Sequence, residues 1–373
     1  RNHSSRRESK YTRPLKIITH LFLLGIGLGV IAGSTLKTIA LQKQKGYSTS
    51  SSWLSINWIS LPKRSILNSQ SLNLGRNKKK ILKLDLSLKG TEITALSQRW
   101  RALANNQKGI EASGYLLFLD DKKFAQLTPS AVLPAASSIK IPILVTALRM
   151  VDSGQLQWNE LVEVRKELIG GGAGWLAYQP LGKRFPIHEI ATEMIRVSDN
   201  TATNLLIERI GGINILNEQF QELGLPSTKV KNLLPDLDGT NTTSTQDLTR
   251  TIAIVDSGQV LTPRTRDLFR EVMSTSKTNR LLPGGLLKGL GSEKNDVDYN
   301  LLIKGYRVYN KTGDIGIAYA DAGLIQMPDN SRAVAGFMVK GPYNDPRSAE
   351  LIREMSAAMA PFLKPKKSNQ PQR

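Results

Sequence analysis

A serine and a lysine three residues apart open a strongly apolar run in this 373-residue chain. Ser137 and Lys140 lie at the start of SSIKIPILVTALRMV, which stops just before Gly154. If the run is a helix that begins at Ser137, the hydroxyl and the amine lie one turn apart, beside unpaired backbone amides. Acyl transfer needs a nucleophile, a base and such N–H donors in one place. The same spacing occurs at four places, and a helix cap with a surface lysine explains the motif taken alone.

Two further polar motifs occur later in the chain, one between two predicted helices and one in a predicted strand. Ser198-Asp199-Asn200 separates two amphipathic helical patterns, and Lys311-Thr312-Gly313 lies late in a predicted strand. Taken singly, the first motif is typical of a helix cap and the second of a polar turn. The three motifs follow one another at separations of 61 and 113 residues, each in an element that suits a functional site.

The scarcity of cysteine and histidine narrows the chemistry. The chain has no cysteine and three histidines, of which only His188 falls in the predicted globular part. This excludes a cysteine protease and thiolate metal ligands, and it disfavours a histidine-rich zinc site. A hydrolase built from this sequence would therefore use a lysine, aspartate, glutamate or tyrosine as its base. We expect no metal and no cofactor.

The net charge of +20 belongs mainly to the two ends of the chain. Residues 1–90 carry 17 Lys and Arg against 2 Asp and Glu, and residues 361–373 add four more cations. The predicted folded region is close to neutral. Because no nucleic-acid motif accompanies the charge, we expect no nucleic-acid partner.

Hydropathy divides the chain into five parts. Residues 17–36 form an uncharged run bounded by lysines, about 30 Å long as a helix, which predicts a single transmembrane anchor. The excess of cations before it favours a cytoplasmic N-terminus and an extracytoplasmic catalytic domain, periplasmic or on the cell surface. The predicted parts are a basic tail (1–16), the anchor (17–36), a Ser/Asn-rich basic linker (37–80), a hydrolase domain (81–363) and a second basic tail (364–373).

Within the domain, strand patterns lie at both ends and helical patterns between them. Alternation predicts an opening strand at 82–88, helical spacing predicts a helix from Ile93 to Leu103, and the 137–222 region is mostly helical. Five further strands are predicted at 114–120, 123–127, 306–313, 318–327 and 332–339, and Asp345-Pro346 opens a last helix. The expected fold class is α+β: a five-stranded antiparallel sheet from both ends of the domain, packed with helices and carrying an all-α insertion.

The ordered motifs together resemble those of class A β-lactamases and penicillin-binding proteins. The segments LPAASSIKIPIL, MIRVSDNTATNLLIERIGG and NKTGD are similar to class A sequences, and the resemblance covers about residues 93–363. It implies a serine hydrolase that acts through an acyl-enzyme, on a β-lactam or an acyl-D-amino peptide.

The resemblance assigns roles to the motif residues. Ser137 would attack the carbonyl, Lys140 would act as base, and Ser198 would relay a proton to the leaving nitrogen. Asn200 would bind the acylamino group of the substrate. Lys311, Thr312 and Gly313 would hold its carboxylate beside the amides of Ser137 and Asp314, which would form the oxyanion hole.

The match breaks in the loop that precedes Thr245. Class A β-lactamases carry there a glutamate that activates the water releasing the acyl group. The best alignment places Leu234 at that position, although a shift of two residues would let Asp236 or Asp238 supply a carboxylate. Without such a base, acylation would persist while release slows.

Three functions follow as expectations. The first is a membrane-anchored β-lactamase-type hydrolase acylated at Ser137, slow in release. The second is a D,D-peptidase, or penicillin-binding protein, that acts on cell-wall peptides. The third is a non-catalytic β-lactam sensor, against which the complete set of motif residues argues.

Overall fold

The structure is a computed structural model that describes residues 90–292 and 295–364. The predicted anchor at 17–36, the linker, the basic tails beyond Lys364 and before the anchor, and the strand at 82–88 lie outside the described residues. Within the part of the chain that is described, no helix has both the length and the apolar character needed to cross a bilayer.

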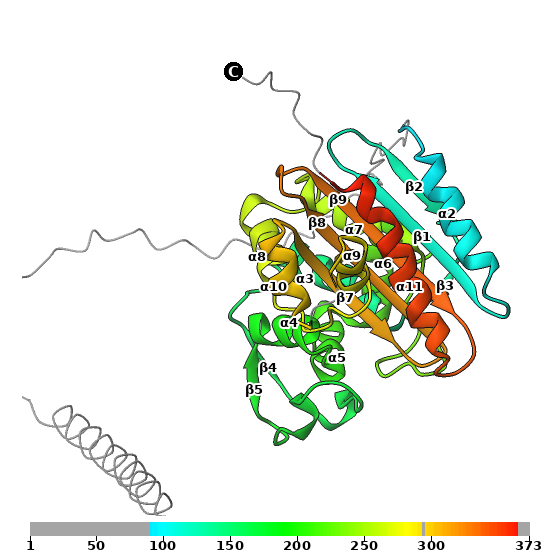
Figure 1. Cartoon of the computed structure of the whole chain (residues 1–373). Helices are drawn as coiled ribbons and strands as arrows, with labels where there is room; N and C mark the ends of the chain where they lie inside the picture. The colour runs from blue at the N-terminus through cyan, green and yellow to red at the C-terminus, as the bar shows by residue number, and fades with distance from the viewer. Residues whose placement is uncertain (1–89, 293–294, 365–373) are drawn as a thin grey trace, which may run out of the picture. The chain divides into compact units, whose positions relative to one another are not determined.

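A five-stranded antiparallel sheet forms the centre of the domain (Figure 1). Its order is β2-β1-β9-β8-β7, so the first two strands of the domain lie beside the last three, as the sequence predicts. Strand β7 is an edge strand that pairs with β8 alone. The strands are β1 (Glu111–Phe118), β2 (Phe124–Leu127), β7 (Arg307–Asp314), β8 (Ala318–Gln326) and β9 (Arg332–Lys340).

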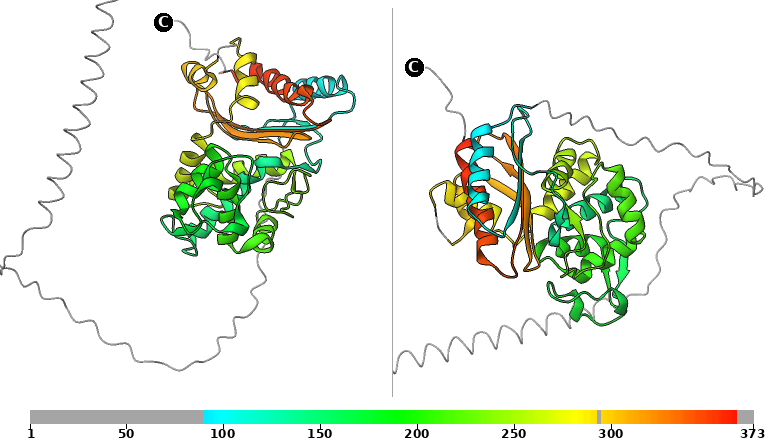
Figure 2. Two further views of the ribbon diagram at one scale, coloured as in Figure 1. Left: turned by 90° about the horizontal axis from the view of Figure 1, so that it is seen from below. Right: turned by 90° about the vertical axis from the view of Figure 1, so that its right-hand side faces the viewer.

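Helices from the two ends of the domain cover one face of the sheet (Figure 2). Trp100 anchors the first of them, because its ring packs edge-on against Phe337 at 5.3 Å and its indole N–H donates to Met355 O at 2.8 Å. The helices of this layer are α2 (Thr94–Asn105), α9 (Leu282–Gly289), α10 (Val297–Ile303) and α11 (Pro346–Met359). Asp345 caps α11, as expected from the Asp-Pro pair.

A group of helices covers the opposite face, which confirms the predicted helical insertion (Figure 2). Helix α3 is buried from Lys140 to Leu148 without interruption, because it runs through the middle of this group and is apolar nearly all round. The group contains α3 (Lys140–Asp152), α4 (Ile187–Arg196), α5 (Asn200–Ile210), α6 (Gly212–Glu222), α7 (Thr245–Asp256) and α8 (Pro263–Ser274). Two small antiparallel ribbons pair segments of the loops that connect these helices. They are β3–β6 (Leu133–Pro134, Thr242–Thr243) and β4–β5 (Leu161–Glu163, Arg184–Pro186).

The expected helix start at Ser137 is wrong by three residues. Residues Ala136–Ile139 form a 3-10 turn, η1, and the α-helix begins at Lys140. The N–H of Ser138 donates to Ala135 O, three residues back, which is the tighter spacing. Pro142 lacks the N–H that a regular helix would give to Ser138 O, so the α pattern starts after this turn.

Candidate active site

Lys140 lies at the centre of the candidate site, fully buried at the junction of η1 and α3. Its Nζ is 3.1 Å from Ser137 Oγ and 3.0 Å from Ser198 Oγ. It also lies 2.6 Å from Ser198 O and 2.9 Å from Asn200 Oδ1. One amine therefore joins the first two sequence motifs.

The surroundings of Lys140 favour its neutral form. Ser198 O and Asn200 Oδ1 can only accept, and the amide of Asn200 is oriented by its Nδ2, which donates to Gly171 O at 2.8 Å. Two N–H groups of the amine can satisfy these two acceptors, and the third position on Nζ then faces the serine hydroxyls, as an N–H in the ammonium or a lone pair in the neutral amine. Burial, and next the charge of Lys311, lower the pKa of Lys140 well below its ordinary value, against the attraction of Asp199. A neutral Lys140 can take the proton of Ser137.

The Ser198-Asp199-Asn200 turn is fixed by the middle residue. Asp199 is the N-cap of α5 and accepts from Ala202 N at 2.8 Å. Its other oxygen accepts from Trp175 N and Leu176 N at 2.6 and 2.8 Å. The cap expected from the sequence is real. It also ties the segment around Trp175 to the turn that carries Ser198.

Strand β7 supplies the opposite side of the site. Lys311 is fully buried and donates from Nζ to Thr312 O at 2.5 Å. Burial lowers the pKa of Lys311 to about 8, although the carboxylate of Asp321 opposes this. A cation here attracts an anionic group placed near Thr312.

A buried carboxylate on the neighbouring strand holds this part of β7. Asp321 lies opposite Thr312 on β8, is fully buried, and accepts from Asn310 Nδ2 at 2.8 Å and Leu282 N at 3.0 Å. Burial raises the pKa of Asp321 to about 6, although the hydrogen bonds from Asn310 and Leu282 act to lower it. Thr312 Oγ1 lies 3.1 Å from Asp321 Oδ2 and 2.8 Å from Thr278 O. Because the hydroxyl has one proton, these acceptors compete for it.

Two backbone N–H groups converge near Ser137. A Cβ on Gly313 would lie 2.7 Å from Ser137 N, so only glycine lets β7 approach the nucleophile this closely. Thr312 N faces away from β8 toward Thr278 Oγ1, at 3.4 Å. In an antiparallel ladder the N–H of Asp314, two residues on, faces the same way. The amides of Ser137 and Asp314 are therefore placed for an oxyanion.

A cavity of about 350 Å³ joins these groups. Its floor and walls include Ser137, Ser198, Asn200, Thr312 and Asp314. Fully buried Lys140 and Lys311 lie behind this lining.

The loop before Thr245 forms another wall of the cavity, with Leu234, Pro235, Asp236 and Leu237. Asp236 Oδ1 accepts from Thr240 N at 3.1 Å and Thr240 Oγ1 at 2.8 Å, and Oδ2 accepts from Asn241 N at 2.6 Å. Asp238 is exposed and is not among the residues lining the cavity. Leu234 is buried and held by Asn204, whose amide pairs with its backbone N and O at 2.8 and 2.7 Å. This wall presents a leucine and a carboxylate whose two oxygens each accept a hydrogen bond from the loop itself.

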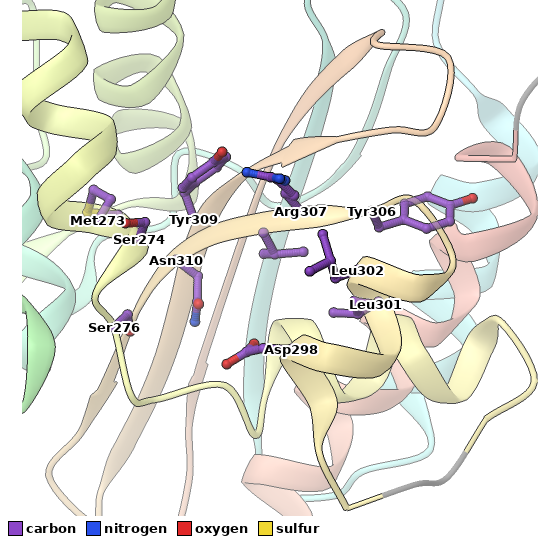
Figure 3. Close-up of a pocket in the computed structure, with 11 residues that line it drawn as sticks. Met273, Ser274, Ser276, Asp298, Leu301, Leu302, Tyr306, Arg307, Tyr309 and Asn310 are labelled. Carbon is purple, nitrogen blue, oxygen red and sulfur yellow. The ribbon is translucent and has the colours of Figure 1, made fainter.

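A separate groove of about 260 Å³ runs along the first half of β7 (Figure 3). Figure 3 shows Asn310 on this strand near the segment that carries Ser276, with Asp298 and Leu301 on α10. The groove contains neither Ser137 nor Ser198. It meets the candidate site through Asn310, whose Nδ2 donates to Thr278 O at 2.8 Å.

All eight site residues predicted from the sequence come together around one cavity. They are Ser137, Lys140, Ser198, Asn200, Lys311, Thr312, Gly313 and Asp314. Sequence reasoning missed Thr278 and Asp321, which hold Thr312. A carboxylate inside the apolar strand AYADAGLIQM was the available signal for Asp321. In the described ranges, no group of His, Cys, Asp or Glu is arranged to hold a metal ion.

Comparison with known proteins gives one consistent result. The model of the "Beta-lactamase enzyme family" matches residues 95–362. A β-lactamase of Rhodobacter capsulatus is 28% identical over 148 residues, 37% of this chain, and the chain spans about half (48%) of that relative's length. The structure of PBP-A is 42% identical over 73% of this chain and 97% of its own, with a TM-score of 0.68. A leucine-to-glutamate variant of PBP-A, solved as its acyl-enzyme with penicillin G, matches over the same shares with a TM-score of 0.67.

Proposed function

Because the chain belongs to the β-lactamase enzyme family of serine hydrolases, which act through an acyl-enzyme, we propose that β-lactams acylate Ser137 and that the acyl group is released slowly. The observation that carries the proposal is the position of Lys140 Nζ, 3.1 Å from Ser137 Oγ and buried with a lowered pKa. The penicillin G acyl-enzyme of a PBP-A variant supports a β-lactam as the acylating compound.

Acylation uses the polar side of the cavity. Lys140 takes the proton of Ser137 as Oγ attacks the lactam carbonyl, and the amides of Ser137 and Asp314 bind the oxyanion. The lactam C–N bond then breaks, and Ser198 Oγ passes a proton to the nitrogen from Lys140, 3.0 Å away. Lys311 and Thr312 hold the carboxylate of the substrate throughout.

Release requires a water molecule and a base to deprotonate it. Leu234 has no group that accepts a proton, and Asp236 uses both oxygens to hold Thr240 and Asn241. A missing general base typically lowers a rate by about 10²–10⁴. The acyl-enzyme should therefore accumulate.

A D,D-peptidase acting on acyl-D-alanyl-D-alanine peptides is the second candidate, and the similarity to PBP-A together with Leu234 favours it. Such a peptide also carries a terminal carboxylate for Lys311 and Thr312. Release of D-alanine from a diacetylated L-lysyl-D-alanyl-D-alanine peptide would support this candidate. Acylation by penicillin G without any peptide cleavage would leave the slow β-lactamase, which still turns over penicillin G, and a sensor, which does not.

The location of the enzyme is also a proposal. The uncharged run at 17–36 and the cations before it support single-pass anchoring with the catalytic domain outside the cytoplasm. Protease added to spheroplasts, from which the outer layers of the envelope have been removed, would then cut the catalytic domain. Protection of that domain until the spheroplast membrane is lysed would contradict this orientation.

Intact mass after exposure to penicillin G tests the nucleophile. The chain should gain the mass of the whole β-lactam, and peptide mapping should place it on Ser137. Ser138→Ala is the matched control, since Ser138 Oγ donates to Ala135 O at 2.6 Å and takes no part in the proposed chemistry. Ser138→Ala should still acquire the label. Labelling of Ser137→Ala would contradict the proposal.

A further inference from the structure

The carboxylate of Asp314 has no role in the acylation described above, which uses only the backbone amide of this residue. Asp314 is exposed and lines the catalytic cavity. Its Oδ1 accepts from Gly316 N at 2.9 Å, which orients the carboxylate. Its Oδ2 has no hydrogen-bond or ion-pair partner among the described residues. One carboxylate oxygen at the cavity is therefore available to a ligand.

The charge of Asp314 is not neutralised by a neighbouring cation. Asp345, a second carboxylate near this end of β7, differs in this respect, because Arg347 binds both of its oxygens. Tyr319 lies opposite Asp314 on β8. Burial, and next the charge of Asp314, raise the pKa of Tyr319. The negative charge of Asp314 thus acts on the groups around it.

Asp314 shares a face of β7 with Thr312. Side chains alternate along a strand, so residues two apart lie on one face at a separation of roughly 7 Å. Gly313, between them, faces the turn that carries the nucleophile, since a Cβ there would lie 2.9 Å from Ala136 Cβ. In the proposed reaction Thr312 holds the carboxylate of the substrate. Asp314 is therefore the next side chain along from that anion and repels it.

The rest of the cavity lining does not offset this repulsion. Of the described residues that line the cavity, two are charged, and both are aspartates. Asp236 uses both oxygens within its own loop, which leaves Asp314 as the one directed at a ligand. The cations Lys140 and Lys311 are fully buried behind the lining. A substrate that carries its own cation beside the carboxylate would convert the repulsion into attraction.

We propose that the side chain of Asp314 determines specificity, favouring acyl donors whose leaving side carries a cationic group beside the carboxylate. Among β-lactams these are cephalosporins with a cationic substituent on the ring methylene. Among peptides they are acyl-D-amino peptides whose leaving residue has a side-chain amine. The proposal rests on acylation at Ser137.

Cephaloridine and cephalothin are matched probes, because they share the acyl group and the ring carboxylate. The group on the ring methylene is a pyridinium cation in cephaloridine and a neutral acetoxy group in cephalothin. Stopped-flow acylation of the full chain gives a second-order rate constant for each. Asp314→Asn keeps an oxygen that can accept from Gly316 N and removes the charge. In this variant the ratio of the cephaloridine rate to the cephalothin rate should fall about threefold to tenfold, and the cephalothin rate should rise.

Two controls show that the effect is local. Asp238→Asn removes the same charge from an exposed residue that does not line the cavity, and it should leave the ratio unchanged. Ampicillin and penicillin G differ by an amine on the acyl side of the lactam. Because Asp314 is assigned to the leaving side, Asp314→Asn should change the ratio of their rates much less.

The possible failures are distinguishable. If neither cephalosporin acylates the unmodified chain, the proposed function fails and this proposal fails with it. If both acylate it, three results overturn this proposal alone: Asp314→Asn and Asp238→Asn giving the same ratio, the ampicillin ratio changing as much as the cephaloridine ratio, or Asp314→Asn changing only release of the acyl group. The last result would make the carboxylate a base for hydrolysis.

Discussion

The two walls of the catalytic cavity differ in where their polar groups are directed. Around Ser137, the amine of Lys140 contacts both serine hydroxyls and fixes Ser198 and Asn200, so the polar groups meet where a substrate would react. In the loop from Leu234 to Asn241, the polar groups bond to one another instead. Asp236 closes the loop through Thr240 and Asn241, and Leu234 takes the place facing the site.

This difference separates formation of an acyl-enzyme from its release. The first wall contains the amine of Lys140 within hydrogen-bond distance of both serine hydroxyls, together with N–H donors for the oxyanion. Of the described residues in the second wall, Asp236 is the carboxylate that lines the cavity, and both of its oxygens accept hydrogen bonds from the loop itself. Substitutions in one wall should therefore change one step and leave the other nearly intact.

The largest effect is expected for Lys140→Met. Removing the base should lower the rate of acylation by a fluorescent penicillin by about 10²–10⁴, while the flexible methionine fills the buried space. Lys166→Met, at an exposed position, is the control and should react normally. Equal rates for the two variants would mean that Lys140 is not the base.

A carboxylate at position 234 should restore release. Leu234→Glu is expected to raise the hydrolysis rate of the acyl-enzyme by about 10² and to change acylation much less. Leu237→Glu makes the same replacement on the same loop, at a side chain that is 65% exposed, and should have little effect. For each variant, formation of the fluorescent adduct measures acylation and its decay measures release. If Leu234→Glu changed acylation and release equally, the loop alignment would be wrong.

Asp321→Asn tests how the carboxylate site is held. The variant should lower the second-order rate of acylation by penicillin G about tenfold, because Asn310 and Thr312 lose a charged acceptor. The methyl ester of penicillin G has no free carboxylate to bind. Its acylation rate, lower from the start, should therefore fall less in Asp321→Asn than the rate for penicillin G. A loss that is the same for acid and ester would show that Asp321 acts on stability instead of substrate binding.

The smallest effect is the pH dependence. Acylation by penicillin G should rise with pH while Lys140 loses its proton, and the lowered pKa of Lys140 brings this rise toward neutrality. It should fall several-fold above about pH 8, where Lys311 becomes neutral and no longer attracts the carboxylate. The methyl ester should lack the alkaline fall. A fall shared by the ester would assign it to another group.

Local patterns predicted most of the fold. Apolar runs next to turn residues identified the hairpin and the late strands, and Asp345-Pro346 marked the start of α11, because these signals depend on residues adjacent in sequence. The start of α3 was misplaced because two features act on the turn at Ala136–Ile139. Pro142 lacks the N–H that would extend the helix, and Gly313 of β7 approaches the turn closely, a contact that neighbouring residues in the sequence do not show.

The candidate site was predicted where motifs carried it and missed where only tertiary contacts do. Ser137, Ser198 and Lys311 belong to recognisable motifs in order along the chain. Thr278 lies 34 residues from Thr312 in an irregular segment, and nothing in its neighbours indicates that its carbonyl accepts from that hydroxyl. The state of Asp236 likewise depends on how its loop folds back to Asn241.

The ratio of two rate constants for penicillin G is the most direct test. Stopped-flow acylation of the unmodified chain, followed by decay of the adduct after excess antibiotic is removed, gives both values. Acylation at saturating antibiotic should exceed release by about 10² or more, because a base serves the first step and none is free for the second. Release as fast as acylation, with no adduct accumulating, would contradict the proposed division between the two walls.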